Sequence, residues 1–270
     1  MNSAFPLKWF SGIAILLCLS FHQVKPQGTD SQPVAKGEDC SDIWKKRPGS
    51  ASGLYWIKPA GAPQVFRVFC EMRKRRGWTV IQRHNGADSL GFNKGWEEYK
   101  QGFGNHAGEH WLGLDPIYYL TNQAGKTAQL LVSLEDFSNA KAYAKYASFK
   151  VSNEENGYQL SLGAYSGTAG DAFRGEDDGE DLRSQDGSKF STIDRDNDGC
   201  DPCRVGDILF LSCSEHRTHS GWWFSSCGMA DLNGDWHSED HYRGWASGVH
   251  WVTWKFFESL KSSVLKIKTA

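Results

Sequence analysis

The sequence predicts an extracellular α+β domain of short strands and a few short helices, held together by disulfide bonds. Three observations support this class. A short apolar segment near the N-terminus is typical of a secretory signal, six of the seven cysteines follow it, and aromatic residues become dense after residue 40 without a long helical period. Because secreted proteins fold in an oxidising compartment, an even number of cysteines indicates disulfide bonds.

The first 24 residues are predicted to be a signal peptide. Lys8 precedes the apolar run 13–19, which is shorter than the roughly 20 apolar residues that a membrane span needs. Cleavage is expected between Ser20 and Gln27, and no later segment is apolar enough to predict a membrane span. Residues 25–39 are polar and contain proline and glycine, so a flexible leader is expected before a domain at 40–268.

Local patterns place the predicted strands and helices. Apolar and polar side chains alternate in part at 65–70 and 78–83, and the basic run between them, 73–76, is expected to be the turn of a hairpin. Further strands are expected at 129–135, 140–146 and 147–151. Short helices are expected at 96–100 and 115–120, the second with Asp115 as its cap and Pro116 in its first turn.

The C-terminal part, residues 163–248, is rich in glycine, aspartate, serine and tryptophan and has little periodicity. A loop region of this length is expected to need a metal ion and disulfides for its order. The acidic run 176–181 within it is expected to be a solvated loop.

The most informative segment is the aspartate-rich run at 190–199. Asp194, Asp196 and Asp198 alternate with other residues, so their oxygens can converge on one cation, and Ca²⁺ takes about six to eight oxygen ligands. An EF-hand is excluded, because Val205 stands where its last glutamate is required and Pro202 cannot enter an exiting helix. A calcium loop inside a larger domain is therefore predicted, with a solvated acidic turn as the alternative.

Composition and motifs disfavour two other classes of protein. The formal net charge of −2 does not suggest a nucleic-acid-binding protein, which needs a clustered basic face. No nucleophile-elbow, zinc-protease or phosphate-loop motif is present, so an enzyme is not predicted. A zinc site at Cys200 and Cys203 with His216 and His219 is a weaker alternative to disulfides.

An ordered set of segments resembles the fibrinogen-related (fibrinogen C-terminal-like) domains across residues 40–268. The segments that carry the resemblance are 40–43, 68–72, 77–83, 92–96, 99–104, 109–114, 190–192, 221–223, 231–234 and 251–255. The resemblance implies a small disulfide-bridged N-terminal part, a central antiparallel sheet with short helices, and a loop-rich calcium-binding C-terminal part. Residues 135–137 and 142–147 are most similar to microfibril-associated members of the family.

The resemblance also implies a calcium site and two disulfides. The side chains of Asp196 and Asp198 and the backbone carbonyls of Cys200 and Pro202 would bind Ca²⁺, while Asp194 would support the loop. The implied disulfides are Cys40–Cys70 and Cys213–Cys227, with Cys203–Cys227 as an alternative to the second.

Residues 204–213 look like an insertion relative to the family pattern, and a retained intron in the gene model would explain them. The alternative is a real variant with an additional strand and a Cys200–Cys203 or Cys203–Cys213 pair.

Many members of this family bind acetylated sugars beside the calcium loop. By position the pocket falls on Thr218, Gly228, Trp245 and Ala246, and Trp222 and His219 are expected to add an apolar wall and a hydrogen-bond donor. Gly228 stands in place of a histidine and Thr218 in place of an aromatic residue, so the pocket is altered.

The expected function is secreted, calcium-dependent binding of carbohydrate or glycoprotein ligands, as in lectin-like innate recognition. The alternative is a structural protein of microfibrils and elastic fibres, which would bind elastic-fibre or collagen matrix proteins through protein–protein contacts. A homo-oligomer is compatible with either function.

Overall fold

The computed structural model describes residues 1, 33–73, 75–175, 184–205, 207–216, 219–238, 248–256 and 258–270. The chain divides into the units Met1–Gln32 and Pro33–Ala270. Apart from Met1, the predicted signal peptide and the leader up to residue 32 lie outside the described residues, as does the acidic run 176–181. Within the described ranges, no helix has the length and apolar character needed to cross a membrane.

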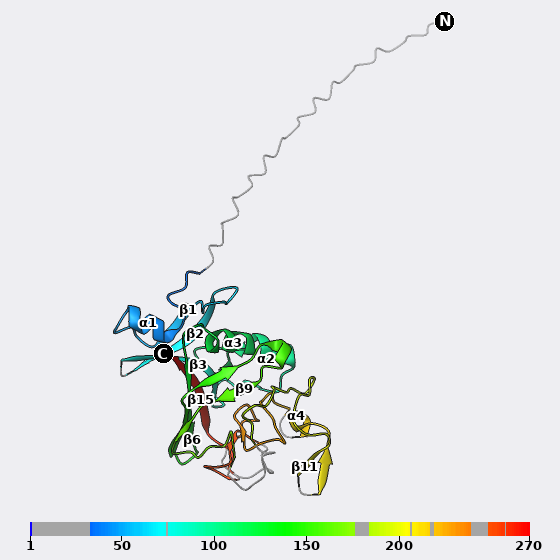
Figure 1. Ribbon diagram of the computed structural model, residues 1–270. Helices are drawn as coiled ribbons and strands as arrows, with labels where there is room; N and C mark the ends of the chain where they lie inside the picture. The colour runs from blue at the N-terminus through cyan, green and yellow to red at the C-terminus, as the bar shows by residue number, and fades with distance from the viewer. Residues whose placement is uncertain are drawn as a thin grey trace. The chain divides into compact units, whose positions relative to one another are not determined.

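A nine-stranded sheet forms the centre of the unit Pro33–Ala270 (Figure 1). The order of its main path is β1-β2-β3-β15-β6-β7-β10, and every pair is antiparallel. These strands are β1 (Gly53–Ile57), β2 (Phe66–Arg73), β3 (Arg76–His84), β6 (Ala128–Glu135), β7 (Lys141–Tyr146), β10 (Tyr165–Gly167) and β15 (Ser262–Thr269), and β4 (Phe103–Gly104) and β5 (His110–Trp111) are attached beside β3. The expected hairpin is confirmed as β2–β3, and the strands expected at 129–135 and 140–146 are confirmed as β6 and β7.

The C-terminal strand β15 lies in the middle of this sheet and was not expected from the sequence. Leu265 faces Gln82 of β3 on one side and Val132 of β6 on the other. Leu265 and Ile267 are buried, so the C-terminal strand contributes apolar side chains to the core of the sheet. In Figure 1 the dark red β15 runs beside β3 and β6.

Among the described residues, the short helices are α1 (Cys40–Lys46), α2 (Trp96–Gln101) and α3 (Leu114–Thr121), with α4 (Cys213–His216) in the C-terminal loops. The helices expected at 96–100 and 115–120 are confirmed as α2 and α3. The expected cap of α3 is wrong, because Gly113 is the N-cap and Asp115 lies in the first turn. Gly113 has φ 110°, which favours glycine, and the Asp115 carboxylate accepts a hydrogen bond from Tyr158 Oη at 2.5 Å instead.

Helix α1 was not expected from the sequence. Its N-cap is Asp39, whose carboxylate accepts the Asp42 N–H at 2.8 Å and contacts Lys126 Nζ at 3.0 Å. The disulfide Cys40–Cys70 joins α1 to β2.

The C-terminal part is built mostly of loops around an aromatic cluster, as expected. A two-stranded sheet of β8 (Phe149–Val151) and β9 (Leu160–Leu162) precedes these loops. Two more lie in or beside them: β11 (Cys203–Val205) with β12 (Ile208–Phe210), and β13 (Ala230–Asp231) with β14 (His250–Trp251). A 3₁₀ turn, η1 (Glu154–Asn156), precedes β9. Phe190, Trp222 and Trp223 are fully buried, and Trp222 stacks on Phe173 with ring centroids 5.7 Å apart.

Candidate functional site

The aspartate-rich run starts from the aromatic core. Phe190 is buried, and Ser191 exchanges two backbone hydrogen bonds with Trp222, at 2.9 and 3.1 Å. A tight turn follows, in which Thr192 and Arg195 exchange backbone hydrogen bonds at 2.9 and 3.1 Å. The core therefore fixes the position at which the three aspartates begin.

Asp194 is turned toward α2 and supports the loop, the role expected for it. Its Oδ1 accepts hydrogen bonds from the Trp96 N–H at 2.8 Å and from Thr192 Oγ1 at 2.7 Å. Burial would raise the pKa of the Asp194 carboxyl, but these two donors outweigh it and hold the pKa below its ordinary value.

Arg195 is directed to another part of the surface. Its guanidinium lies 3.8 Å above the Trp96 ring and 3.7 Å from a carboxylate oxygen of Glu154. The same Glu154 binds Lys100 at 2.6 Å. The Arg195 side chain therefore contacts α2 and η1.

Asp196 and Asp198 form the candidate metal centre. Asp196 Oδ1 accepts the Asp198 N–H at 3.1 Å, while Asp198 accepts the Cys200 N–H on Oδ1 at 3.0 Å and the Cys213 N–H on Oδ2 at 2.8 Å. Burial raises the pKa of the Asp198 carboxyl to about 6, against the lowering effect of these donors, and the negative charge of Asp196 adds to the rise.

A hard divalent cation fits this pair of carboxylates. Burial is the larger cause of the raised pKa of Asp198, and the repulsion between the two neighbouring negative charges adds to it. Carboxylate oxygens are the ligands that Ca²⁺ prefers, and a bound cation removes the repulsion. The carbonyl oxygen of Cys200, an expected ligand, lies 3.3 Å from Cys203 Sγ.

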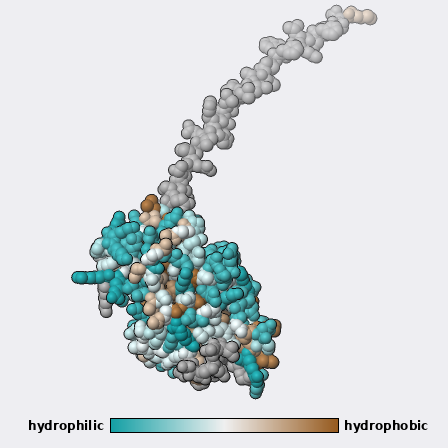
Figure 2. Space-filling view, in the orientation of Figure 1, coloured by the Kyte–Doolittle hydropathy of each residue, from teal (hydrophilic) through white to brown (hydrophobic). Residues whose placement is uncertain are grey.

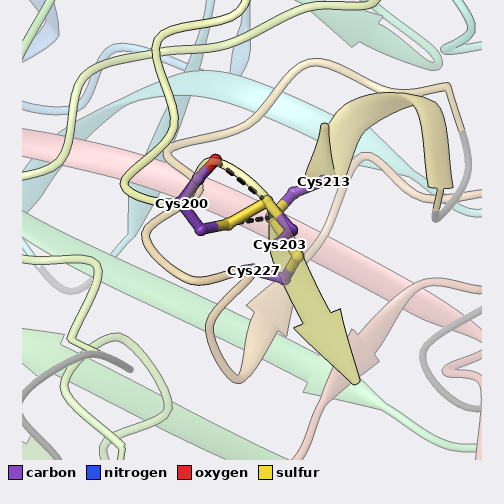
Figure 3. A group of neighbouring side chains, drawn as sticks. All are labelled: Cys200, Cys203, Cys213 and Cys227. Carbon is purple, nitrogen blue, oxygen red and sulfur yellow. Dashed lines mark hydrogen bonds between the residues drawn. A yellow bond between two sulfur atoms is a disulfide. The ribbon is translucent and has the colours of Figure 1, made fainter. Parts of the chain in front are cut away.

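Four cysteines gather directly behind this loop (Figure 3). Their bonds in the structure are Cys200–Cys203 and Cys213–Cys227, so the alternative pair Cys203–Cys227 is not formed. The sulfurs of Cys200 and Cys203 are therefore not free to bind zinc. His216, another residue of that alternative site, stacks its ring on Phe210 with ring centroids 3.8 Å apart.

The run 204–213 forms an additional hairpin rather than a loop. Strands β11 and β12 pair Cys203 with Phe210, and α4 begins at Cys213. Ile208 and Leu209 at its tip are 59% and 62% exposed. Figure 2 shows apolar atoms at the end of the molecule where Figure 1 places β11. The extra strand and the Cys200–Cys203 bond are the features expected of a real variant.

The expected sugar pocket is changed in two places. Trp222 is 0% exposed, so it is a core residue and cannot be a surface wall; its stacking on Phe173 explains the burial. Gly228 is also buried, with φ 70°, and the Gln185 side chain fills the space that a side chain there would need. His219 is exposed, as a donor to a ligand must be. Thr218, Trp245 and Ala246 lie outside the described residues.

A cavity that the sequence did not indicate lies between β3 and residues 235–237. Its volume is about 410 Å³, and its lining includes His84, Gly86, Asp235, Trp236 and His237. The loop after β3 is held by the buried carboxylate of Glu109, which accepts backbone N–H groups of residues 85, 86 and 88 at 2.6–2.9 Å. Glu109 lies in the segment 109–114 that carried the family resemblance, but nothing in the sequence marked it as the support of this loop.

Comparisons with known proteins agree with this architecture. A family model for the C-terminal globular domain of the fibrinogen beta and gamma chains matches residues 36–270. The chain belongs to the fibrinogen C-terminal domain family. The predicted fold class is thereby confirmed for the sheet, the short helices and the disulfides, whereas its calcium-binding part stays a prediction. The protein is a fibrinogen-related domain, a type of extracellular ligand-binding module.

Relatives of this fibrinogen-related domain include human fibrinogen-like protein 1, which is 42% identical over 236 residues, covering 85% of this chain and 71% of that protein. Angiopoietin-4 of Bos taurus is 38% identical over 232 residues, covering 85% of this chain and 42% of that protein. The narrower similarity of 135–137 and 142–147 to microfibril-associated glycoprotein 4 stays a prediction.

Two solved structures show the same fold. The fibrinogen-like globe domain of human ANGPTL2 superposes with a TM-score of 0.73 at 39% identity, covering 86% of this chain and 98% of that one. Lamprey fibrin D-dimer, complexed with the peptide ligand Gly-His-Arg-Pro-amide, superposes with a TM-score of 0.77 at 34% identity, covering 92% and 79%.

Proposed function

We propose that this fibrinogen-related domain is a secreted, calcium-dependent binding protein. The observation that carries the proposal is the Asp196–Asp198 pair, whose second carboxylate is oriented by N–H groups from both neighbouring disulfides. A calcium ion bound there would neutralise the negative charges of these two carboxylates. The carbonyls of Cys200 and Pro202, with water, would complete the ligands.

The ligand class we propose is carbohydrate or glycoprotein, bound by the C-terminal loops. Trp245 is the expected stacking surface, because flat sugar faces pack on indole rings, and the exposed His219 is the expected donor. At Gly228 no side chain is available to an acetyl group, and Gln185 occupies the adjacent space.

A structural role in microfibrils or elastic fibres is the second candidate. It is favoured by the burial of Trp222 and Gly228, which removes two of the six expected pocket residues from the surface. It is also favoured by the lamprey fibrin relative, whose ligand is a peptide rather than a sugar. In this case elastic-fibre or collagen proteins would be the partners.

Retention of the full chain on an N-acetylated-sugar resin and on immobilised matrix proteins, with calcium or with a chelator, separates the two candidates. Calcium-dependent retention on the sugar, lost in Trp245→Ala, supports the lectin function. Trp56→Ala is the matched control, because Trp56 is a partly exposed tryptophan of β1, outside the C-terminal loops. Retention on matrix proteins alone supports the structural function, and equal retention with and without chelator contradicts calcium dependence.

A further inference from the structure

Two disulfides of this chain lie in direct contact. The Sγ atoms of Cys200 and Cys203, which are bonded to each other, are 3.6 and 3.7 Å from Sγ of Cys213. All four sulfurs, including that of Cys227, lie within 4.8 Å of one another (Figure 3). A small movement of any one sulfur would therefore bring it within bonding distance of a sulfur other than its present disulfide partner.

The four cysteines differ in burial. Cys203, Cys213 and Cys227 are buried, whereas Cys200 is half-buried. A thiol that approaches from solution can therefore reach the Cys200–Cys203 bond, and it meets Cys200 first. The Cys213–Cys227 bond is shielded from direct attack.

We propose that Cys200–Cys203 is a thiol-exchange site, which accepts a low-molecular-weight thiol and passes the exchange on to Cys213–Cys227. The incoming thiol loses its proton and attacks Cys200 Sγ; a mixed disulfide forms there, the Cys200–Cys203 bond breaks, and Cys203 leaves as a thiolate. Cys203 then attacks Cys213 Sγ, 3.7 Å away, so the Cys203–Cys213 bond forms and Cys227 leaves as a thiolate.

The sequence closes without net oxidation or reduction. The Cys227 thiolate attacks Cys200 Sγ, forms Cys200–Cys227, and expels the external thiol, which regains its proton. Two disulfides are present before and after, so no oxidant or reductant is consumed and the thiol acts as a catalyst. The product pairs are Cys203–Cys213 and Cys200–Cys227.

The hairpin between these cysteines allows the change at low cost. Strands β11 and β12 lie between Cys203 and Cys213, and their tip residues Ile208 and Leu209 are largely exposed. Few packed side chains there would have to move when the sulfurs change partners. By contrast, the disulfide Cys40–Cys70 joins two buried residues of α1 and β2, and it serves as the internal control.

Peptide mapping tests the exchange, because trypsin separates the cysteines conveniently. Cleavage after Arg195, Arg204, Arg217 and Arg243 gives one peptide with Cys200 and Cys203, one with Cys213 and one with Cys227. In the present pairing the first peptide carries an internal disulfide and the other two are joined. In the exchanged pairing all three peptides are joined.

The full chain is incubated with millimolar reduced glutathione and chelator, quenched with acid and alkylating reagent, and mapped by mass spectrometry. We expect the three-peptide species to appear at a rate that rises with thiol concentration, while Cys40–Cys70 stays intact. Opening of Cys200–Cys203 with Cys213–Cys227 unchanged, or no reaction at either bond, would overturn the proposal.

A variant tests the same step without added thiol. Cys200→Ser leaves a resident thiol on Cys203, 3.7 Å from Cys213 Sγ. We expect alkylation to divide between Cys203 and Cys227, because Cys203 displaces Cys227 from Cys213. Alkylation of Cys203 alone contradicts the proposal. The double variant Cys200→Ser with Cys203→Ser keeps only Cys213–Cys227 and should release no thiol.

Discussion

The backbone N–H of Trp96 donates a hydrogen bond to Oδ1 of Asp194 at 2.8 Å, although 98 residues separate the two in sequence. Trp96 is the first residue of α2, and the first N–H groups of a helix have no partner within it. A side chain at the N-cap, Gly95, would meet the Asp194 carboxylate, so glycine leaves the space in which Asp194 acts as a distant cap. The aspartate loop and α2 are therefore joined.

Asp194→Ala should lower the free energy of unfolding by about 1 kcal/mol, the usual cost of a lost helix cap. Because Oδ1 of Asp194 accepts its hydrogen bonds from Trp96 and Thr192, the loss should be equal with calcium and with chelator. Chemical denaturation in both conditions measures it. A variant that keeps its stability but loses its response to calcium would show that Asp194 is a metal ligand instead.

His84 should make the protein sensitive to acid. Burial lowers the pKa of His84 to about 4, and both ring nitrogens lack a hydrogen-bond partner among the described residues. The unfolded chain gains its proton near pH 6.5, whereas the folded chain resists protonation until about pH 4. Stability should therefore be full above pH 6.5 and fall as the pH drops from 6.5 to 4, by roughly 1 kcal/mol per pH unit.

His84→Phe should flatten this slope, because a phenyl ring can take the same edge-on place against Phe92, 4.0 Å away, without a proton to gain. Denaturation midpoints between pH 4 and 7 measure the slope. Some slope should persist, since burial also lowers the pKa of His110 to about 4. An unchanged slope in His84→Phe would mean that His84 does not control the acid response.

Gly228→His restores the side chain of the family pattern and should destabilise this chain. The position has φ 70°, which costs other residues roughly 1–2 kcal/mol, and Gln185 already fills the adjoining space. Gly187→His is the matched control, because Gly187 has φ 92° and open space around it. Thermal melting should show the larger loss at Gly228, and equal losses would show that Gln185 gives way.

Much of the sheet could be predicted from local patterns, because β2 and β6 contain the alternation of a half-buried strand. The neighbouring β3 is buried along most of its length. The central position of β15 could not, since residues 262–269 pair only with strands far away in sequence. Helix α1 was missed for a similar reason. Its seven residues are fixed by the Asp39 cap and the Cys40–Cys70 bond rather than by a long periodic pattern.

At the candidate site, the sequence indicated where the aspartate-rich loop lies, but not which of the expected pocket residues are buried. The supporting role of Asp194 was an expectation from the family resemblance, and its hydrogen bond to the Trp96 N–H agrees with it. Spacing could not tell that Trp222 packs inside on Phe173, because the surrounding loop has no periodicity to mark its inner face. The hairpin formed by β11 and β12 agrees with the alternative that residues 204–213 are a genuine family variant rather than a retained intron. Sequencing the mature transcript would show whether their codons are retained.

Calcium titration calorimetry of the full chain, beside Asp196→Ala, tests the central claim most directly. The account predicts one site in the wild type, no heat of binding in Asp196→Ala, and a calcium-dependent rise in melting temperature only in the wild type. At a calcium concentration about 100 times the dissociation constant, that rise corresponds to roughly 2.7 kcal/mol. Equal binding by both proteins, or no binding by either, would contradict the account.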